Sequence, residues 1–108
     1  MFTSGEKKLV EAFKKKIADL YPRQIIDVLV YGSKSRGDDS KNSDIDILVI
    51  TSFDDWRRAD EIRSHGYELD WDIGAPFSIQ VMSIDHFNFL RENGFQFAKD
   101  VERDAIRV

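Results

Sequence analysis

Apolar and polar positions along the chain follow two different periods, and these periods predict its helices and strands. From Ser4 to Leu20, apolar residues recur every three or four positions among lysines and glutamates, which predicts an amphipathic helix capped by Ser4. Two runs rich in branched apolar residues, Ile25–Gly32 and Asp44–Thr51, predict buried strands, because such side chains pack well on a pleated sheet. The first half of the chain is therefore expected to form one helix and two strands.

In the second half of the chain, predicted helices and strands continue to alternate. Apolar residues at helical spacing predict a long helix that begins at Asp54 or Asp55 and ends at Ile73. Alternating apolar and polar residues predict a half-exposed strand over Pro76–Ser83. Because no repeat or linker interrupts the chain, we expect a single domain over residues 1–108, with an α/β fold in which helices flank a small mixed sheet. The last predicted elements are a helix over Ile84–Glu92, further helical turns in 95–104 and a short edge strand in 105–108.

Several residues inside these elements allow two interpretations. Gly66 lowers helix stability by about 1 kcal/mol relative to alanine, so it either permits a close crossing, which we favour, or marks a break. Trp56 and Trp71 are expected to anchor the long helix in the core, although either could present a flat face to a base or a partner. His65 and His86 lack a third ligand at zinc-site spacing, so surface or capping roles are expected. The last third of the chain has more aromatic side chains than a small helix can bury, and an exposed remainder would indicate a partner interface or a homo-oligomer. These are Phe87, Phe89, Phe95 and Phe97.

Composition narrows the classes of function. The chain has 108 residues and no cysteine, which excludes disulfides and thiol catalysis and suits a reducing cytoplasm. Its first residues lack the apolar segment of a secretory signal, and no apolar run approaches the roughly 20 residues needed to span a bilayer, so no membrane partner is expected. A net charge of −4 disfavours nucleic acid except as an acceptor substrate. Clustered lysines in the first quarter leave a local basic patch open, although we favour a solvated helix face.

Two aspartates at the start of the second strand are the first candidates for chemistry. Asp44 and Asp46 are two positions apart, so on a strand both side chains leave the same face, with their backbones about 6–7 Å apart. Neighbouring carboxylates repel each other unless a cation lies between them, and Mg²⁺ prefers oxygen ligands. The pair therefore predicts a magnesium site or, taken alone, a solvated strand end.

A glycine and a serine lie where the preceding strand ends. Gly32 would let backbone amides approach a phosphate closely, and the Ser33 hydroxyl would add a hydrogen-bond donor. Gly37 suits a position that needs a positive φ. A tight turn without a ligand is the alternative. Because this turn and the aspartates lie at the ends of two consecutive strands, we favour a site for a nucleoside triphosphate with Mg²⁺.

The segments GSKSRG, Gly32–Gly37, and SDIDILV, Ser43–Val49, resemble the signature of the nucleotidyltransferase superfamily that includes DNA polymerase beta, specifically its small stand-alone minimal nucleotidyltransferase domains. The resemblance implies transfer of AMP from ATP, with Mg²⁺, to a protein or RNA acceptor. It assigns metal binding and catalysis to Asp44 and Asp46. Nucleotide binding is assigned to Gly32, Ser33, Arg36, Gly37 and Ser43.

One departure from the family pattern keeps two functions open. Active members carry a third carboxylate on the next strand, where this sequence has SIQVMS and Gln80 is the nearest polar candidate. An amide cannot act as a general base, and Asp70 and Asp72 come before that strand. The chain is thus expected to be either an enzyme or a catalytically weak module that binds nucleotide or a partner. The resemblance implies that this partner is a helical HEPN-type toxin, neutralised by modification or by complex formation. A nucleic-acid-binding fragment is disfavoured by the acidic balance.

Overall fold

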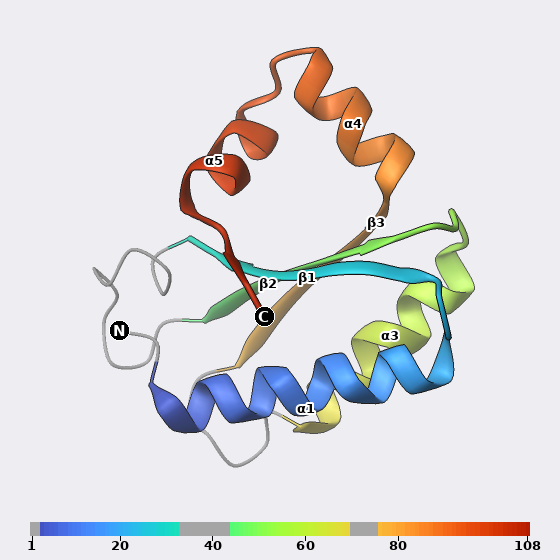
Figure 1. Ribbon diagram of the computed structural model, residues 1–108, viewed down its shortest axis with the longest axis vertical. Helices are drawn as coiled ribbons and strands as arrows, with labels where there is room; N and C mark the ends of the chain where they lie inside the picture. Colours follow the sequence, from blue (N-terminus) through green and yellow to red (C-terminus); the bar gives the residue numbers. More distant parts are fainter. Residues whose placement is uncertain (1–2, 33–43, 70–75) are drawn as a thin grey trace.

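Helices and strands alternate along the chain as the sequence predicts (Figure 1). The computed structural model describes residues 3–32, 44–69 and 76–108. The bounds agree with the predicted elements to within about two residues, except that the predicted end of the long helix, at Ile73, lies outside the described residues. None of the helices in the described ranges is both long and apolar enough to cross a membrane. The elements are α1 (Ser4–Leu20), β1 (Ile25–Tyr31), β2 (Ile45–Thr51), α3 (Trp56–Leu69), β3 (Phe77–Ser83), α4 (Ile84–Glu92), α5 (Gln96–Asp104) and β4 (Ile106–Arg107).

The strands form one mixed sheet in the order β3-β2-β1-β4. β1 is antiparallel to both β2 and β4, whereas β2 and β3 run parallel and are connected through α3. Figure 1 shows α1 and α3 on one face of the sheet and α4 and α5 on the other. Both faces of β2 are therefore covered, which explains why Ile47 to Ile50 are all buried. These observations confirm the predicted fold class.

Each face of the sheet has its own cluster of buried side chains. The smaller cluster joins the sheet to α4 and α5, and the larger cluster joins it to α1 and α3. Successive side chains of a strand point to opposite faces, so β2 contributes alternate residues to the two clusters. Asp46 is in phase with Leu48 and Ile50 and therefore lies on the face that α4 and α5 cover. The smaller cluster consists of Leu29, Leu48, Ile50, Phe87, Ala98 and Val101.

The start of α1 corrects one prediction. Thr3, not Ser4, is the N-cap: its hydroxyl accepts from the Glu6 amide at 3.1 Å, and the Glu6 carboxylate accepts from the Thr3 amide at 2.9 Å. This reciprocal arrangement is a capping box, which needs a Glu three positions after the cap, and only Thr3 has one there.

The lysines of α1 are largely paired. The Lys14 ammonium donates to the carbonyl of Val108, and the Lys16 ammonium lies 3.4 Å from the Glu68 carboxylate. Lys15 forms a 3.8 Å ion pair with Asp19 one helical turn away. These contacts favour a solvated helix face over a basic binding patch.

Two predictions about α3 have opposite outcomes. A Cβ on Gly66 would lie 2.3 Å from Ile79 Cδ1 and 3.1 Å from the Phe13 ring, which confirms the close crossing. Trp56, however, is not a core anchor: it is 69% exposed at the first residue of the helix, and the Arg57 guanidinium lies 5.3 Å from its ring centre. Trp71 lies outside the described residues.

The aromatic side chains near the end of the chain divide as expected into core and surface. Phe87 is buried, whereas Phe89 and Phe95 are exposed with their ring centres 6.0 Å apart. The His86 ring stacks on Phe89, and its backbone amide donates to the Ser83 cap. In the described part of the chain, neither histidine belongs to a group of three metal-ligating side chains. A partner interface at Phe89 and Phe95 stays a prediction.

Candidate functional site

The antiparallel pairing of β1 and β2 brings the predicted glycine turn to the predicted aspartates. Tyr31, the last residue of β1, is the register partner of Asp46 near the start of β2. Gly32 follows Tyr31 directly, so it lies at the same end of the sheet. Two segments that the sequence separates by a loop therefore meet at one strand end, as a phosphate and metal site requires.

Gly32 is required at its position for two reasons. Its φ is +76°, a left-handed conformation that side chains disfavour. A Cβ there would also lie 2.5 Å from Asp46 Oδ2, inside van der Waals contact. The missing side chain thus makes the space that the Asp46 carboxylate occupies.

The two aspartates differ in environment. Asp44 is exposed immediately before β2, whereas Asp46 is partly buried on the α4–α5 face of the sheet. Both provide hard oxygen ligands at the strand end, and Asp44 is exposed to solvent. Mg²⁺ is commonly held by one or two carboxylates together with waters and substrate phosphates, so the donor set fits a magnesium–nucleotide complex.

The register of β3 corrects which residue lies beside the aspartates. Ser78 is the neighbour of Asp46 on β3, whereas Gln80 is paired with Leu48, two residues further along. The nearest position for a third ligand is therefore Ser78, whose hydroxyl is neutral. No group of three potential metal ligands is present among the described residues, so a third acid does not join the pair there. Asp70 and Asp72 lie outside those residues.

Tyr31 and Phe97 flank the site, and sequence reasoning did not identify them. Burial, and after it the negative charge of Asp46, raises the pKa of the half-buried Tyr31 phenol to about 12, so the phenol is neutral at physiological pH. Phe97, on α5, contacts Tyr31 edge to face with ring centres 5.6 Å apart. Tyr31 could have been suspected from its place next to Gly32. No local signal links it to a residue 66 positions later in the sequence.

Four of the predicted nucleotide-binding residues cannot be placed. Ser33, Arg36, Gly37 and Ser43 lie outside the described residues, so their roles stay predictions. Gly32, Asp44 and Asp46 are the predicted site residues that the structure describes, and it brings Gly32 and Asp46 into contact range.

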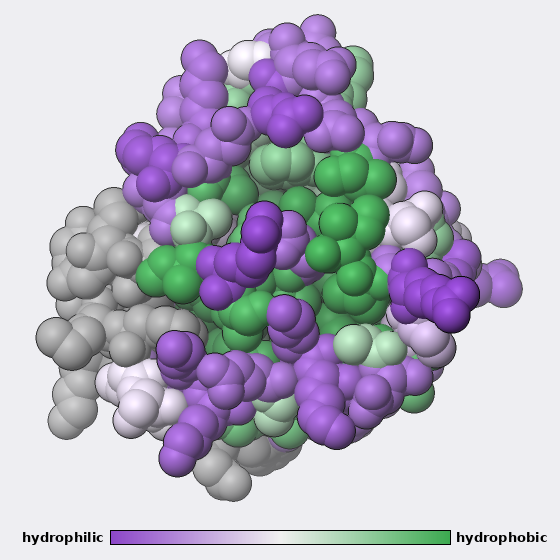
Figure 2. Space-filling model, in the orientation of Figure 1, coloured by the Kyte–Doolittle hydropathy of each residue, from purple (hydrophilic) through white to green (hydrophobic). Residues whose placement is uncertain are grey.

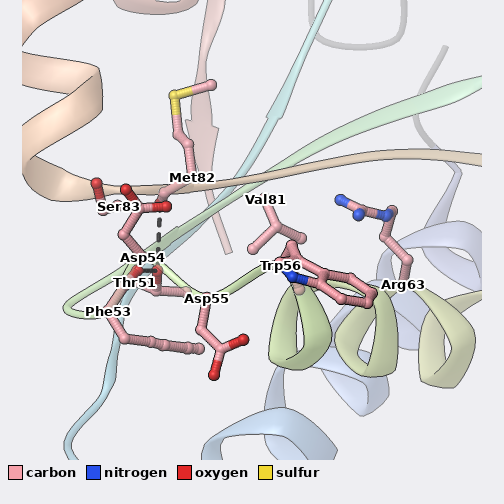
Figure 3. A pocket seen from close by; sticks show the side chains of 10 residues that line it. Thr51, Phe53, Asp54, Asp55, Trp56, Arg63, Val81, Met82 and Ser83 are labelled. Carbon is pink, nitrogen blue, oxygen red and sulfur yellow. Dashed lines mark hydrogen bonds between the residues drawn. The ribbon is translucent and has the colours of Figure 1, made fainter.

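A cavity of about 200 Å³ lies at the other end of β2 and β3 (Figure 3). Figure 3 shows Trp56 and Arg63 of α3 along one side and Ser83 at the other. Thr51, which ends β2, lines the cavity, and its hydroxyl donates to a backbone carbonyl at 2.7 Å. Because Thr51 is five residues after Asp46, the cavity is roughly 16 Å from the carboxylates. It is too distant to bind phosphates held at Asp46.

Comparisons with known proteins agree with this geometry. The family model described as "Nucleotidyltransferase domain" matches residues 10–105. The fold is similar to the crystal structure of a candidate nucleotidyltransferase from Sulfolobus solfataricus, with a TM-score of 0.59 and 19% sequence identity. That match covers 93% of this chain and 76% of the other. No curated protein matches the sequence.

Proposed function

This chain belongs to the nucleotidyltransferase domain family, and from that premise we propose that it transfers AMP from ATP to a hydroxyl group of a protein or RNA acceptor, using Mg²⁺. Family membership supports nucleotidyl transfer in general, with a nucleoside triphosphate and a divalent metal ion. The choice of ATP, Mg²⁺ and acceptor is our proposal. The observation that carries it is the close approach of the Asp46 carboxylate to Gly32, into the space that a Cβ would fill, at the shared end of β1 and β2.

The proposed reaction replaces a phosphoanhydride bond of ATP with a phosphate ester to the acceptor. The acceptor oxygen bonds to the α-phosphorus, the bond from that phosphorus to the bridging oxygen of the β-phosphate breaks, and pyrophosphate leaves. The acceptor hydroxyl loses its proton to water. Asp44 and Asp46 hold Mg²⁺, which neutralises charge on the phosphate oxygens when bound. Gly32 keeps the approach to Asp46 clear, and Ser33, Arg36, Gly37 and Ser43 are proposed to contact the triphosphate.

Labelling with ATP that carries a radioactive α-phosphate tests the assignment. The chain is incubated with Mg²⁺, labelled ATP and a helical HEPN-type protein, which we propose as acceptor. Asp44→Ala and Asp46→Ala should each reduce labelling more than about 100-fold, because loss of an outer-shell partner alone costs about 10–100-fold in metal affinity or activity. Asp54→Ala removes an exposed acid at the other end of β2 and serves as the matched control. Labelling that survives both site substitutions would contradict the assigned site.

A second candidate function is neutralisation of that toxin by binding alone. Two observations favour it: Ser78 stands where a third carboxylate would complete the metal site, and Phe89 and Phe95 form an exposed aromatic pair. In this case Asp46→Ala should leave the complex intact, and Phe89→Ser with Phe95→Ser should disrupt it in size-exclusion chromatography. Self-association lost in the same double variant would instead identify the pair as a homo-oligomer contact.

A further inference from the structure

One row of side chains crosses the sheet at the candidate site. Tyr31 on β1, Asp46 on β2 and Ser78 on β3 are register partners in that order. Directly opposed residues of antiparallel strands have Cβ atoms about 4.5–5.5 Å apart, so the Tyr31 ring begins beside the Asp46 carboxylate. The carboxylate therefore has a large aromatic neighbour on one side and a small hydroxyl on the other.

Helix α5 fixes the aromatic member of this row. Phe97 meets the Tyr31 ring at an interplanar angle of 85°, an edge-to-face contact that is favourable beyond its buried area. The helix is held to the sheet by Ala98 and Val101, which are 0% and 1% exposed. Figure 1 shows α5 on the same side of the sheet as α4, over the part of β1 where that strand ends. Because Phe97 belongs to this well-packed helix, its contact restricts the position of the Tyr31 ring.

The orientation of the Asp46 carboxylate indicates the effect of the contact between Phe97 and Tyr31. Asp46 Oδ2 is turned toward Gly32, where it takes the space that a Cβ would fill. Tyr31 is the register partner of Asp46 on β1, so its ring is the neighbouring side chain on that strand. If that ring moved, the carboxylate could rotate into the freed volume and leave its place at the strand end.

We propose that Tyr31 and Phe97 are positioning residues that hold the Asp46 carboxylate in its metal-binding orientation, so that α5 forms one wall of the site. This inference rests on the proposed function, because it assumes that Asp46 binds the metal. It also assigns α5 a function in catalysis. Packing alone accounts for its other buried residues.

Matched phenylalanine substitutions test the proposal. Phe97→Leu removes the edge-to-face contact with Tyr31. Phe87→Leu makes the same change in the same hydrophobic cluster and leaves that contact in place. Phe87 is the more buried of the two, so its variant should lose at least as much thermal stability. Binding of Mn²⁺ with a non-hydrolysable ATP analogue, followed by electron paramagnetic resonance of free Mn²⁺, gives the affinity.

We expect Phe97→Leu and Tyr31→Leu to weaken Mn²⁺ binding about tenfold, and Phe87→Leu to leave it unchanged. Tyr31→Phe keeps the ring and should retain affinity within about twofold of the unmodified chain. Equal affinities for the two phenylalanine variants would overturn the inference. If the unmodified chain and Asp46→Ala bind Mn²⁺ equally, the metal site itself fails, which is a separate result.

Discussion

Replacement of Gly32 by alanine tests the site most directly, because the structure gives the size of the disturbance. The new Cβ would lie 2.5 Å from Asp46 Oδ2, and ordinary contact begins at 3.4 Å. The carboxylate oxygen must therefore move by roughly 0.5–0.9 Å to relieve the clash. Metal–ligand distances in working sites hold to within about 0.2 Å, so a displacement of this size should disturb metal binding. We expect Gly32→Ala to weaken binding of Mn²⁺ with a non-hydrolysable ATP analogue at least about tenfold.

Gly94 provides the control for backbone strain. Its φ of +70° is close to that of Gly32, but a Cβ there would meet nothing within 4 Å. The left-handed conformation costs about 1–2 kcal/mol for a residue with a side chain, so both variants should lose similar stability. Only Gly32→Ala should also lose binding.

Two assays separate these effects. Urea unfolding gives the free energy of unfolding of each variant, and the Mn²⁺ titration gives its affinity. Because the atom that clashes is the tip of a short side chain, most of the damage at Gly32 should appear in affinity and little in additional instability. If Gly32→Ala binds as tightly as Gly94→Ala, the position of the Asp46 carboxylate is not critical and our reasoning is refuted.

Three further predictions concern packing, the third ligand and acid stability. Gly66→Ala should lower the free energy of unfolding by up to about 2 kcal/mol, because overpacking of the core costs about 1–3 kcal/mol and the gain in helix propensity offsets about 1 kcal/mol of it; an increase in a urea titration would contradict the close crossing. Ser78→Asp should strengthen Mn²⁺ binding about tenfold and Gln80→Asp should not, because only the former is beside Asp46; the reverse ranking would show that the register is wrong. Hydrogen bonds, first from a side-chain guanidinium and then from a backbone amide, hold the pKa of Asp55 below its usual 3.8, so their stabilisation is present above that pH and lost as pH falls through the lowered pKa. Asp55→Asn should accordingly lower the melting temperature at pH 7 but change it little at pH 2, and a pH-independent difference would exclude this electrostatic origin.

Local patterns were sufficient to predict the helices and strands and to propose the first residues of the candidate site. The hydrophobic periods located the helices and strands because these depend on residues a few positions apart, although the cap of α1 is Thr3 rather than the predicted Ser4. The spacing of Asp44 and Asp46 and the glycine after β1 identified the candidate chemistry for the same reason. The family match agrees with that reading.

The amino-acid sequence was enough to predict the alternation of elements, the Asp44 and Asp46 pair and the glycine turn, because each depends on residues that are close together in the chain. That Ser78 rather than Gln80 is next to Asp46 follows from the folded structure alone, because strand register depends on pairing between distant segments. The folded structure also decided that Trp56 is exposed and that Phe97 reaches Tyr31. Those outcomes depend on how helices pack on the sheet, which no local period encodes.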